Sequence, residues 1–259
     1  MRQALVVSLL IVWGAGCTLA GQKSKPPAAA PKVTGACPSS GDAALKDVLD
    51  SMDRAAKSFN GAEVSFVWDV YQRAANQKDT QRGVMYIRKK KAQIEMAADI
   101  TDPKEPRRNI RYSGDTVRLY QYKPNGINQI TEYKAGSNKA TVETFLLLGF
   151  GSPSDELCQQ FKIRYDGVEN VDGKPVSRLE LIPQDPGVRR TFDRILLWID
   201  TRRGICVQQQ FFEPNSGDYR LVKYTKITPK DKIADTHFKL KTEDKPTVQQ
   251  LGAPEGPGR

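Results

Sequence analysis

The chain is 259 residues long and carries 40 Lys and Arg against 30 Asp and Glu, a formal net charge of +10 at pH 7. A single His argues against a multi-histidine metal site or a His-based catalytic triad. The sequence also lacks a nucleophile elbow, a phosphate-binding Gly loop and any metal-type Cys spacing, so it predicts no catalytic residue, no metal site and no cofactor.

The first 20 residues have the pattern of a signal peptide. A short basic start is followed by an apolar run over residues 4–13, which is too short to span a membrane, and then by small residues. Two cleavage patterns remain open. Thr18, Leu19 and Ala20 suit ordinary signal peptidase, whereas residues 14–17 (GAGC) resemble a lipobox in which Cys17 would be lipidated. Export is predicted in both cases.

Residues 21–41 are rich in Pro, Ala, Ser and Lys and almost without large apolar side chains. Such a segment buries too little surface to offset its ordering entropy, so we expect a disordered tether. Export also implies an oxidising compartment. Cys158 and Cys206 lie in the folded region, where either a disulfide between them or two buried thiols would fit.

The folded region begins with a helix and continues as strands. Apolar residues recur at three- and four-residue spacing over 44–56, which predicts a helix, and alternation begins at Val64. Short Gly-, Asn- and Asp-containing turns separate about ten or eleven strands and favour antiparallel pairing. Twelve segments are candidates for these ten or eleven strands: 64–70, 83–89, 93–96, 108–112, 116–122, 128–133, 161–165, 176–182, 195–199, 205–212, 219–227 and 238–241.

One apolar segment interrupts the strands. Residues 141–150 (TVETFLLLGF) have a helical pattern, and residues 154–160 could form a second short helix. We therefore expect a curved sheet with helices on one face. The central helix could fill the core or act as a lid over a cavity.

The order of these features resembles the LolA family of periplasmic outer-membrane lipoprotein carriers, over about residues 44–249. Four segments carry the resemblance: the opening helix with Lys57, Ser58 and Phe59 at its end, the strand 83–89, the apolar segment 145–149, and the closing turn and strand 233–240. Lys90 stands where the family has Pro.

The resemblance implies a mainly β (α+β) domain over residues 42–245 and a disordered tail over 246–259. The domain would be an unclosed, strongly curved antiparallel β-barrel, with an N-terminal helix and a central lid helix over an apolar cavity. The predicted cavity residues are Val64, Phe66, Trp68, Val84, Tyr86, Ile94 and Met96, with Phe145, Leu146 and Leu148 from the lid. In the family a basic residue on the second strand holds the lid closed; its position here is Lys89, with Arg88 as the neighbour shifted by one.

The function implied is that of a non-enzymatic, monomeric periplasmic carrier or acceptor, which binds acyl chains of lipoproteins or lipids on their way to the outer membrane. Three alternatives stay open. The same side chains could form the filled core of a β-sandwich, because periodicity does not distinguish a filled interior from an empty one. An envelope-stress sensor of the same fold would bind a protein partner, and a secreted hydrolase is the third possibility.

Basic clusters occur at residues 88–91, 107–108, 189–190 and 202–203. Export argues against nucleic acid as their partner. Anionic head groups at a membrane surface would fit them, and so would a role as a solvated, solubilising face.

Overall fold

The computed structural model describes residues 42–90, 93–104, 107–122, 128–136, 139–240 and 246–251, without the side chains of residues 128 and 251. The predicted signal peptide, the tether and Cys17 lie outside the described residues. None of the helices in the described part of the chain is both long enough and apolar enough to cross a membrane.

The N-terminal helix α1 (Ala43–Ser58) forms as predicted. Asp42 caps it, because its carboxylate accepts a hydrogen bond from the Leu45 N–H at 3.0 Å. One face of the helix is buried, including Leu45, Val48 and Met52. The three- and four-residue spacing of these side chains explains why this segment is an amphipathic helix packed on the sheet.

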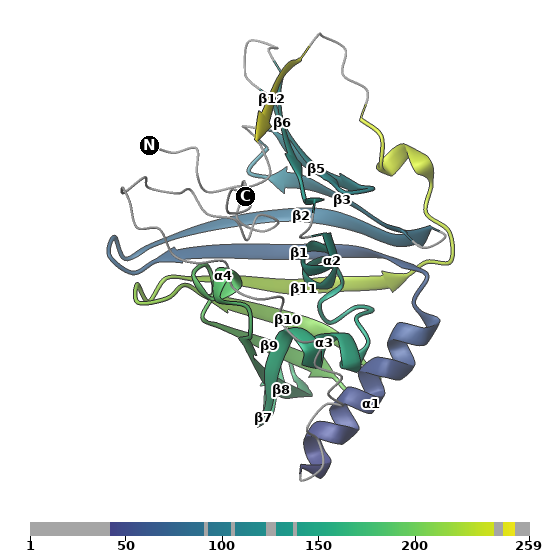
Figure 1. Ribbon diagram of the computed structural model, residues 1–259, viewed down its shortest axis with the longest axis vertical. Helices are drawn as coiled ribbons and strands as arrows, with labels where there is room; N and C mark the ends of the chain where they lie inside the picture. The colour runs from purple at the N-terminus through teal and green to yellow at the C-terminus, as the bar shows by residue number, and fades with distance from the viewer. Residues whose placement is uncertain are drawn as a thin grey trace, which may run out of the picture.

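The described strands form one sheet of 12, in the order β12-β6-β5-β4-β3-β2-β1-β11-β10-β9-β8-β7 (Figure 1). Every pair is antiparallel except β12 with β6. The strands are β1 (Gly61–Gln72), β2 (Gln77–Lys90), β3 (Gln93–Asp102), β4 (Arg108–Ser113), β5 (Thr116–Tyr122), β6 (Asn128–Lys134), β7 (Phe161–Val171), β8 (Lys174–Pro183), β9 (Arg194–Asp200), β10 (Ile205–Phe212), β11 (Tyr219–Pro229) and β12 (Thr247–Leu251).

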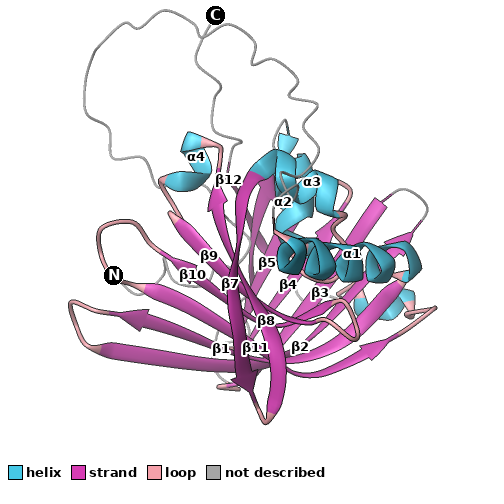
Figure 2. Cartoon of the chain, turned by 90° about the horizontal axis from the view of Figure 1, so that it is seen from below, coloured by secondary structure: helices cyan, strands magenta, loops and turns pink. Residues whose placement is uncertain are grey.

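The sheet is strongly curved (Figure 2). Its two outer strands, β12 and β7, do not pair with each other, so it is unclosed. Figure 2 shows the helices gathered on its concave side. These are α1, α2 (Lys139–Leu147), α3 (Ser154–Gln160) and the short α4 (Pro186–Arg189). The predicted fold class, an unclosed antiparallel half-barrel with helices over one face, is confirmed.

The predictions for the C-terminal region are wrong in two places. Residues 238–240 form no strand; they follow the 3-10 helix η3 (Asp235–His237), and the Phe238 ring lies 4.0 Å from the Arg88 guanidinium carbon. Thr247–Leu251 is strand β12 rather than part of a disordered tail. In both places a contact between distant parts of the chain determines the structure, with Arg88 for residues 233–238 and with β6 for β12. The local sequence pattern does not reveal such contacts.

The interior contains two large apolar clusters. The first joins β1–β6 and β11 to α2, and the second joins α1 and α3 to β7–β10. Leu146 belongs to the first cluster and Leu148 to the second, so the end of α2 connects them. Gly149 follows with φ +78°, and a Cβ there would lie 2.2 Å from the Cys206 Cβ. Only glycine fits this close, left-handed position.

Neither alternative for Cys158 and Cys206, a disulfide between them or two buried thiols, is correct. Cys206 is a free, fully buried thiol in the second cluster, whereas Cys158 is disulfide-bonded. The Cys206 thiol donates to the Gln208 carbonyl at 2.9 Å, and burial raises its pKa to about 12. The remaining cysteines of the sequence, Cys17 and Cys37, lie outside the described residues.

Candidate functional site

Alternation along β1 places Val64, Phe66 and Trp68 on the concave face, where all three are buried. The cross-strand partners confirm the register: Val64 lies opposite Met85, and Phe66 opposite Gly83. A Cβ at Gly83 would lie 2.7 Å from the Phe66 Cζ. The glycine therefore lets the Phe66 ring lie across β2.

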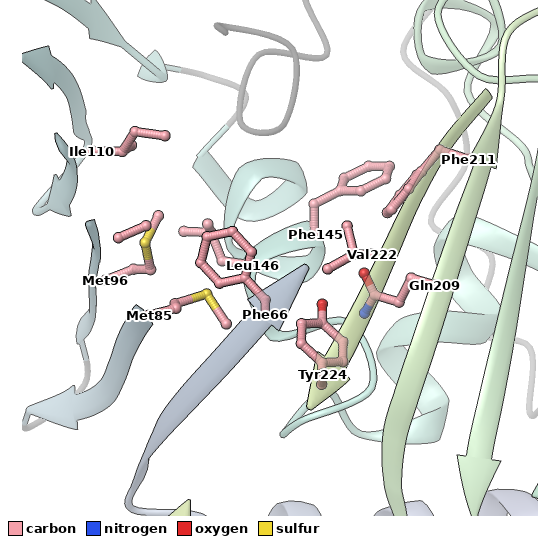
Figure 3. Close-up of a pocket in the computed structure, with 11 residues that line it drawn as sticks. Phe66, Met85, Met96, Ile110, Phe145, Leu146, Gln209, Phe211, Val222 and Tyr224 are labelled. Atoms are coloured by element: carbon pink, nitrogen blue, oxygen red, sulfur yellow. The ribbon is translucent and has the colours of Figure 1, made fainter. Parts of the chain in front are cut away.

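An apolar cavity of about 60 Å³ lies between α2 and the concave face (Figure 3). Its lining residues come from β1–β4, α2, β10 and β11: Phe66, Met85, Met96, Ala98, Ile110, Phe145, Leu146, Gln209, Phe211, Val222 and Tyr224. The amide of Gln209 donates to the Leu148 carbonyl at 2.6 Å, and burial holds the pKa of Tyr224 well above its ordinary value. With Gln209 occupied and Tyr224 neutral, the cavity wall suits a hydrocarbon ligand.

Four of the predicted cavity residues line this cavity: Phe66, Met96, Phe145 and Leu146. Ile94 instead lines a second space, described below. Val64, Trp68 and Leu148 are buried in the clusters around the cavity without being among its lining residues.

On β2 the predicted faces are reversed. Met85 and Ile87 face the concave side, opposite Val64 and Ala62. Val84 and Tyr86 therefore face the convex side, where the Tyr86 ring stacks on His237 with centroids 3.8 Å apart. The prediction of Val84 and Tyr86 as cavity residues is therefore wrong. The aromatic Tyr86 can lie on the convex face because a segment about 150 residues further along the chain covers it there.

Arg88 also lies on the convex side. It bonds Glu95 at 2.6 Å and Asp235 at 2.5 Å, and donates to the Ile233 carbonyl at 2.5 Å. Hydrogen bonds from Arg88 and Lys90 hold the pKa of Asp235 below its usual value. Arg88 thus fastens the C-terminal segment to the sheet, and its predicted contact with the lid is wrong.

Lys89, on the opposite face, points toward the helices. Its ammonium donates to the Ala56 carbonyl at the end of α1 (3.3 Å) and lies 5.6 Å from the centre of the Phe59 ring. It also borders a space of about 400 Å³ between the sheet, α2 and α3, together with Glu143 and Glu156. Lys89 therefore stands beside the predicted lid.

The two ends of the α2 segment are held differently. At its C-terminal end the Gly149 carbonyl accepts a hydrogen bond from the Cys206 N–H of β10 at 2.8 Å. Toward the other end, Glu143 accepts a hydrogen bond from the Tyr112 hydroxyl of β4 at 3.0 Å, while its ion pair with Lys139 (3.8 Å) lies within α2 itself. The C-terminal end is tied by the backbone, whereas these other contacts use side chains alone.

Several cavity residues were not predicted from the sequence: Met85, Ala98, Ile110, Gln209, Phe211, Val222 and Tyr224. Alternation within 219–227 could have identified Val222 and Tyr224, since both occupy the same face as Trp68 and Phe66. Gln209 carried no such signal, because a polar side chain is not expected in an apolar wall. In the described part of the chain, no group of three His, Cys, Asp or Glu is placed to hold a metal ion.

No family model and no curated protein sequence matches the chain. Among solved structures, MucB is similar over 80% of this chain and 66% of its own, just under two thirds, with 14% identity and a TM-score of 0.49. A LolA superfamily protein from Nitrosomonas europaea is similar over 75% of this chain and 97% of its own (14% identity, TM-score 0.39). The lipoprotein LppX of Mycobacterium tuberculosis is similar over 70% and 95% (12% identity, TM-score 0.40).

These identities and scores are low, and they assign no activity, substrate or partner to the chain. What the chain itself displays is a single unclosed sheet with helices on the concave side, arranged in the order that the sequence predicted. This is the fold class that the resemblance to the LolA family implied.

Proposed function

We propose that this protein is exported to the bacterial envelope, binds an acyl chain of a lipid or lipoprotein, and carries it toward the outer membrane. The observation that supports this is the apolar cavity between α2 and the concave face. Each methylene group moved from water into such a site contributes about 0.8 kcal/mol. A chain of ordinary length would therefore bind without any catalytic residue or cofactor.

Binding requires α2 to move. A cavity of about 60 Å³ is smaller than the roughly 150 Å³ that holds a benzene molecule in an engineered protein interior. The end of α2 near Glu143, held by side chains, would lift, while the backbone bond at Gly149 would act as the fixed end. Lys89 would help hold this lid closed from its position beside α2 and α3.

Adjacent residues on β2 provide a matched test of the cavity. Met85→Trp would fill it, whereas Val84→Trp adds the same ring on the convex face. With a fluorescent hexadecanoyl probe, we expect Met85→Trp to bind at least tenfold more weakly than the wild type and Val84→Trp to bind like it. Equal effects of the two substitutions would contradict the cavity as the binding site.

Native mass spectrometry of protein purified from membranes tests the cargo. Co-purified acyl species are expected; a protein that is empty and captures no lipopeptide would contradict the carrier. Lys89→Leu should alter the transfer of cargo, and unchanged transfer would remove Lys89 from the lid.

The lipid anchor is tested separately. Cells labelled with radioactive palmitate should incorporate label into the wild type but not into Cys17→Ser if Cys17 is lipidated. An unlabelled wild type would assign the N-terminus to ordinary signal peptidase.

A further inference from the structure

Beside the cavity lie three buried polar side chains that each have an unpartnered atom. They are Trp68 (0% exposed), Gln81 (7%) and Arg108 (8%), and the atoms are the Trp68 Nε1, the Gln81 Oε1 and the Arg108 Nε. Among the described residues, none of these three side chains has a hydrogen-bond or ion-pair partner. A buried polar group normally has one.

The strand register places all three on the concave face. Arg108 alternates with Ile110, which lines the cavity, and with Tyr112, which bonds Glu143 of α2. Trp68 follows the cavity residue Phe66 on β1, and Gln81 lies directly opposite Trp68 on β2. A two-residue step along a strand is roughly 7 Å. Trp68 and Gln81 therefore lie one step beyond Phe66, and Arg108, two strands away from Gln81, lies one step beyond Ile110 on β4, in each case toward the end of the sheet that faces away from α1.

Arg108 differs from the other arginines of this half of the sheet. Arg111, three residues further along β4 and on the convex face, bonds Asp99 at 2.7 Å, and Arg118 on β5 bonds Glu132 at 2.6 Å. No described carboxylate pairs with Arg108, and burial lowers the pKa of its guanidinium. An unpaired buried cation is strongly unfavourable, so the site is suited to an anion supplied from outside the chain.

We propose that Arg108 binds the anionic head group, a carboxylate or a phosphate, of the amphiphile whose acyl chain occupies the cavity. This inference rests on the proposed function and specifies its ligand. The Trp68 N–H would be a second donor to the anion, and the Gln81 carbonyl would accept a hydrogen bond from a hydroxyl of the same head group. Chain and head group would then enter adjoining parts of one concave surface.

The test compares ligands that share a chain and differ in charge. Using the full chain at pH 8, calorimetry would measure hexadecanoate, a palmitoyl lysophosphatidic acid, hexadecanol and inorganic phosphate alone. We expect the wild type to prefer at least one anionic amphiphile over hexadecanol by tenfold or more, and the stronger of the two identifies the head group. Phosphate alone should bind at least a hundredfold more weakly than that amphiphile; comparable binding would overturn the assignment to an amphiphile.

Arg108→Met removes the charge but keeps the apolar stem. It should abolish the preference for the anionic amphiphile over hexadecanol, whereas Arg108→Lys should keep part of the preference. Arg107→Met is the matched control, since Arg107 is the exposed neighbour whose guanidinium carbon lies 4.5 Å from the centre of the Tyr122 ring. A preference that survives in Arg108→Met would overturn the inference.

Two readouts keep this inference separate from the proposed function. If hexadecanoate and hexadecanol bind equally well, the head-group site is wrong and the acyl cavity stands; if neither the anionic amphiphiles nor hexadecanol binds, both fail. Arg108→Met should also unfold at a temperature equal to or above that of the wild type, because it removes an unpaired buried charge. A lower unfolding temperature would mean that Arg108 is paired within the chain.

Discussion

Tryptophan and arginine side chains on the two faces of the sheet differ in whether they have a carboxylate partner. On the convex face Trp198 donates to Glu169 at 2.6 Å, and Arg111 bonds Asp99. On the concave face Trp68 and Arg108 have no such partners among the described residues. Trp198 and Arg111 thus each have a carboxylate partner within the chain, whereas the concave face has an apolar cavity with Trp68 and Arg108 beside it. That difference is the basis for placing the proposed ligand on the concave side.

The largest expected effect tests the assignment of faces on β2. Ile87 is fully buried on the concave face, so Ile87→Ala should lower the free energy of unfolding of the protein by about 2–5 kcal/mol. Val84 is half-buried on the convex face, so Val84→Ala should lower the free energy of unfolding by less than about 1.5 kcal/mol. Urea unfolding measures both values. A larger loss for Val84→Ala would reverse the two faces.

The next effect concerns Arg88, which belongs to the convex face and not to the lid. Arg88→Gln removes charged hydrogen bonds to the mostly buried Glu95 and should destabilise the protein by about 1.5–3 kcal/mol. Acyl-chain affinity should not change. Lys90→Gln is the control, because its bond to Asp235 is exposed and should contribute little. Faster release of cargo in Arg88→Gln would show instead that Arg88 helps to hold the lid closed.

Cys206 tests how tightly the second cluster is packed. Its thiol is fully buried, with a pKa of about 12, so no thiolate is available near neutral pH. Reaction with a thiol reagent should be at least a hundredfold slower in the folded than in the unfolded protein at the same pH. Rapid labelling of the folded protein would show that this cluster opens readily.

The smallest effect is a pH dependence confined to the convex face. The pKa of Asp235 is lowered by Arg88 and Lys90, so its contribution is present above the unfolded-state pKa of about 3.9 and is lost as the pH falls through the lower, folded-state pKa. Hydrogen exchange of residues 233–238 should therefore accelerate, relative to the rest of the sheet, only in strong acid. In Asp235→Asn this extra acceleration should disappear; an unchanged pH profile would assign it to another group.

Much of the fold could be predicted because its elements have clear local periods. The apolar spacing of α1 and the alternation of Val64, Phe66 and Trp68 each specify one buried face. Apolar character around α2 likewise indicated a buried helix. These features depend on residues close together in the sequence, and the structure confirms the elements that they predicted.

The errors arose where both faces of a strand carry apolar residues. In β2, Val84, Met85, Tyr86 and Ile87 are all apolar or aromatic, so the pattern does not select a face. His237 stacks on Tyr86 and covers it on the convex face, and this contact joins segments that are distant in the sequence. Arg108 likewise belongs to a basic cluster of the sequence, which fits either anionic head groups or a solvated face. Its burial depends on tertiary packing and not on its neighbours in sequence.

The two tryptophans allow the most direct test of an acyl chain on the concave face. Trp68 lies beside the cavity residue Phe66, and Trp198 lies in a small apolar cluster on the convex face. Two full-length proteins would each retain one of them: Trp13→Phe with Trp198→Phe, and Trp13→Phe with Trp68→Phe. Brominated hexadecanoate, which quenches indole fluorescence on contact, should quench Trp68 at saturation and leave Trp198 bright. Equal quenching of both, or quenching of Trp198 alone, would contradict a cavity on the concave face.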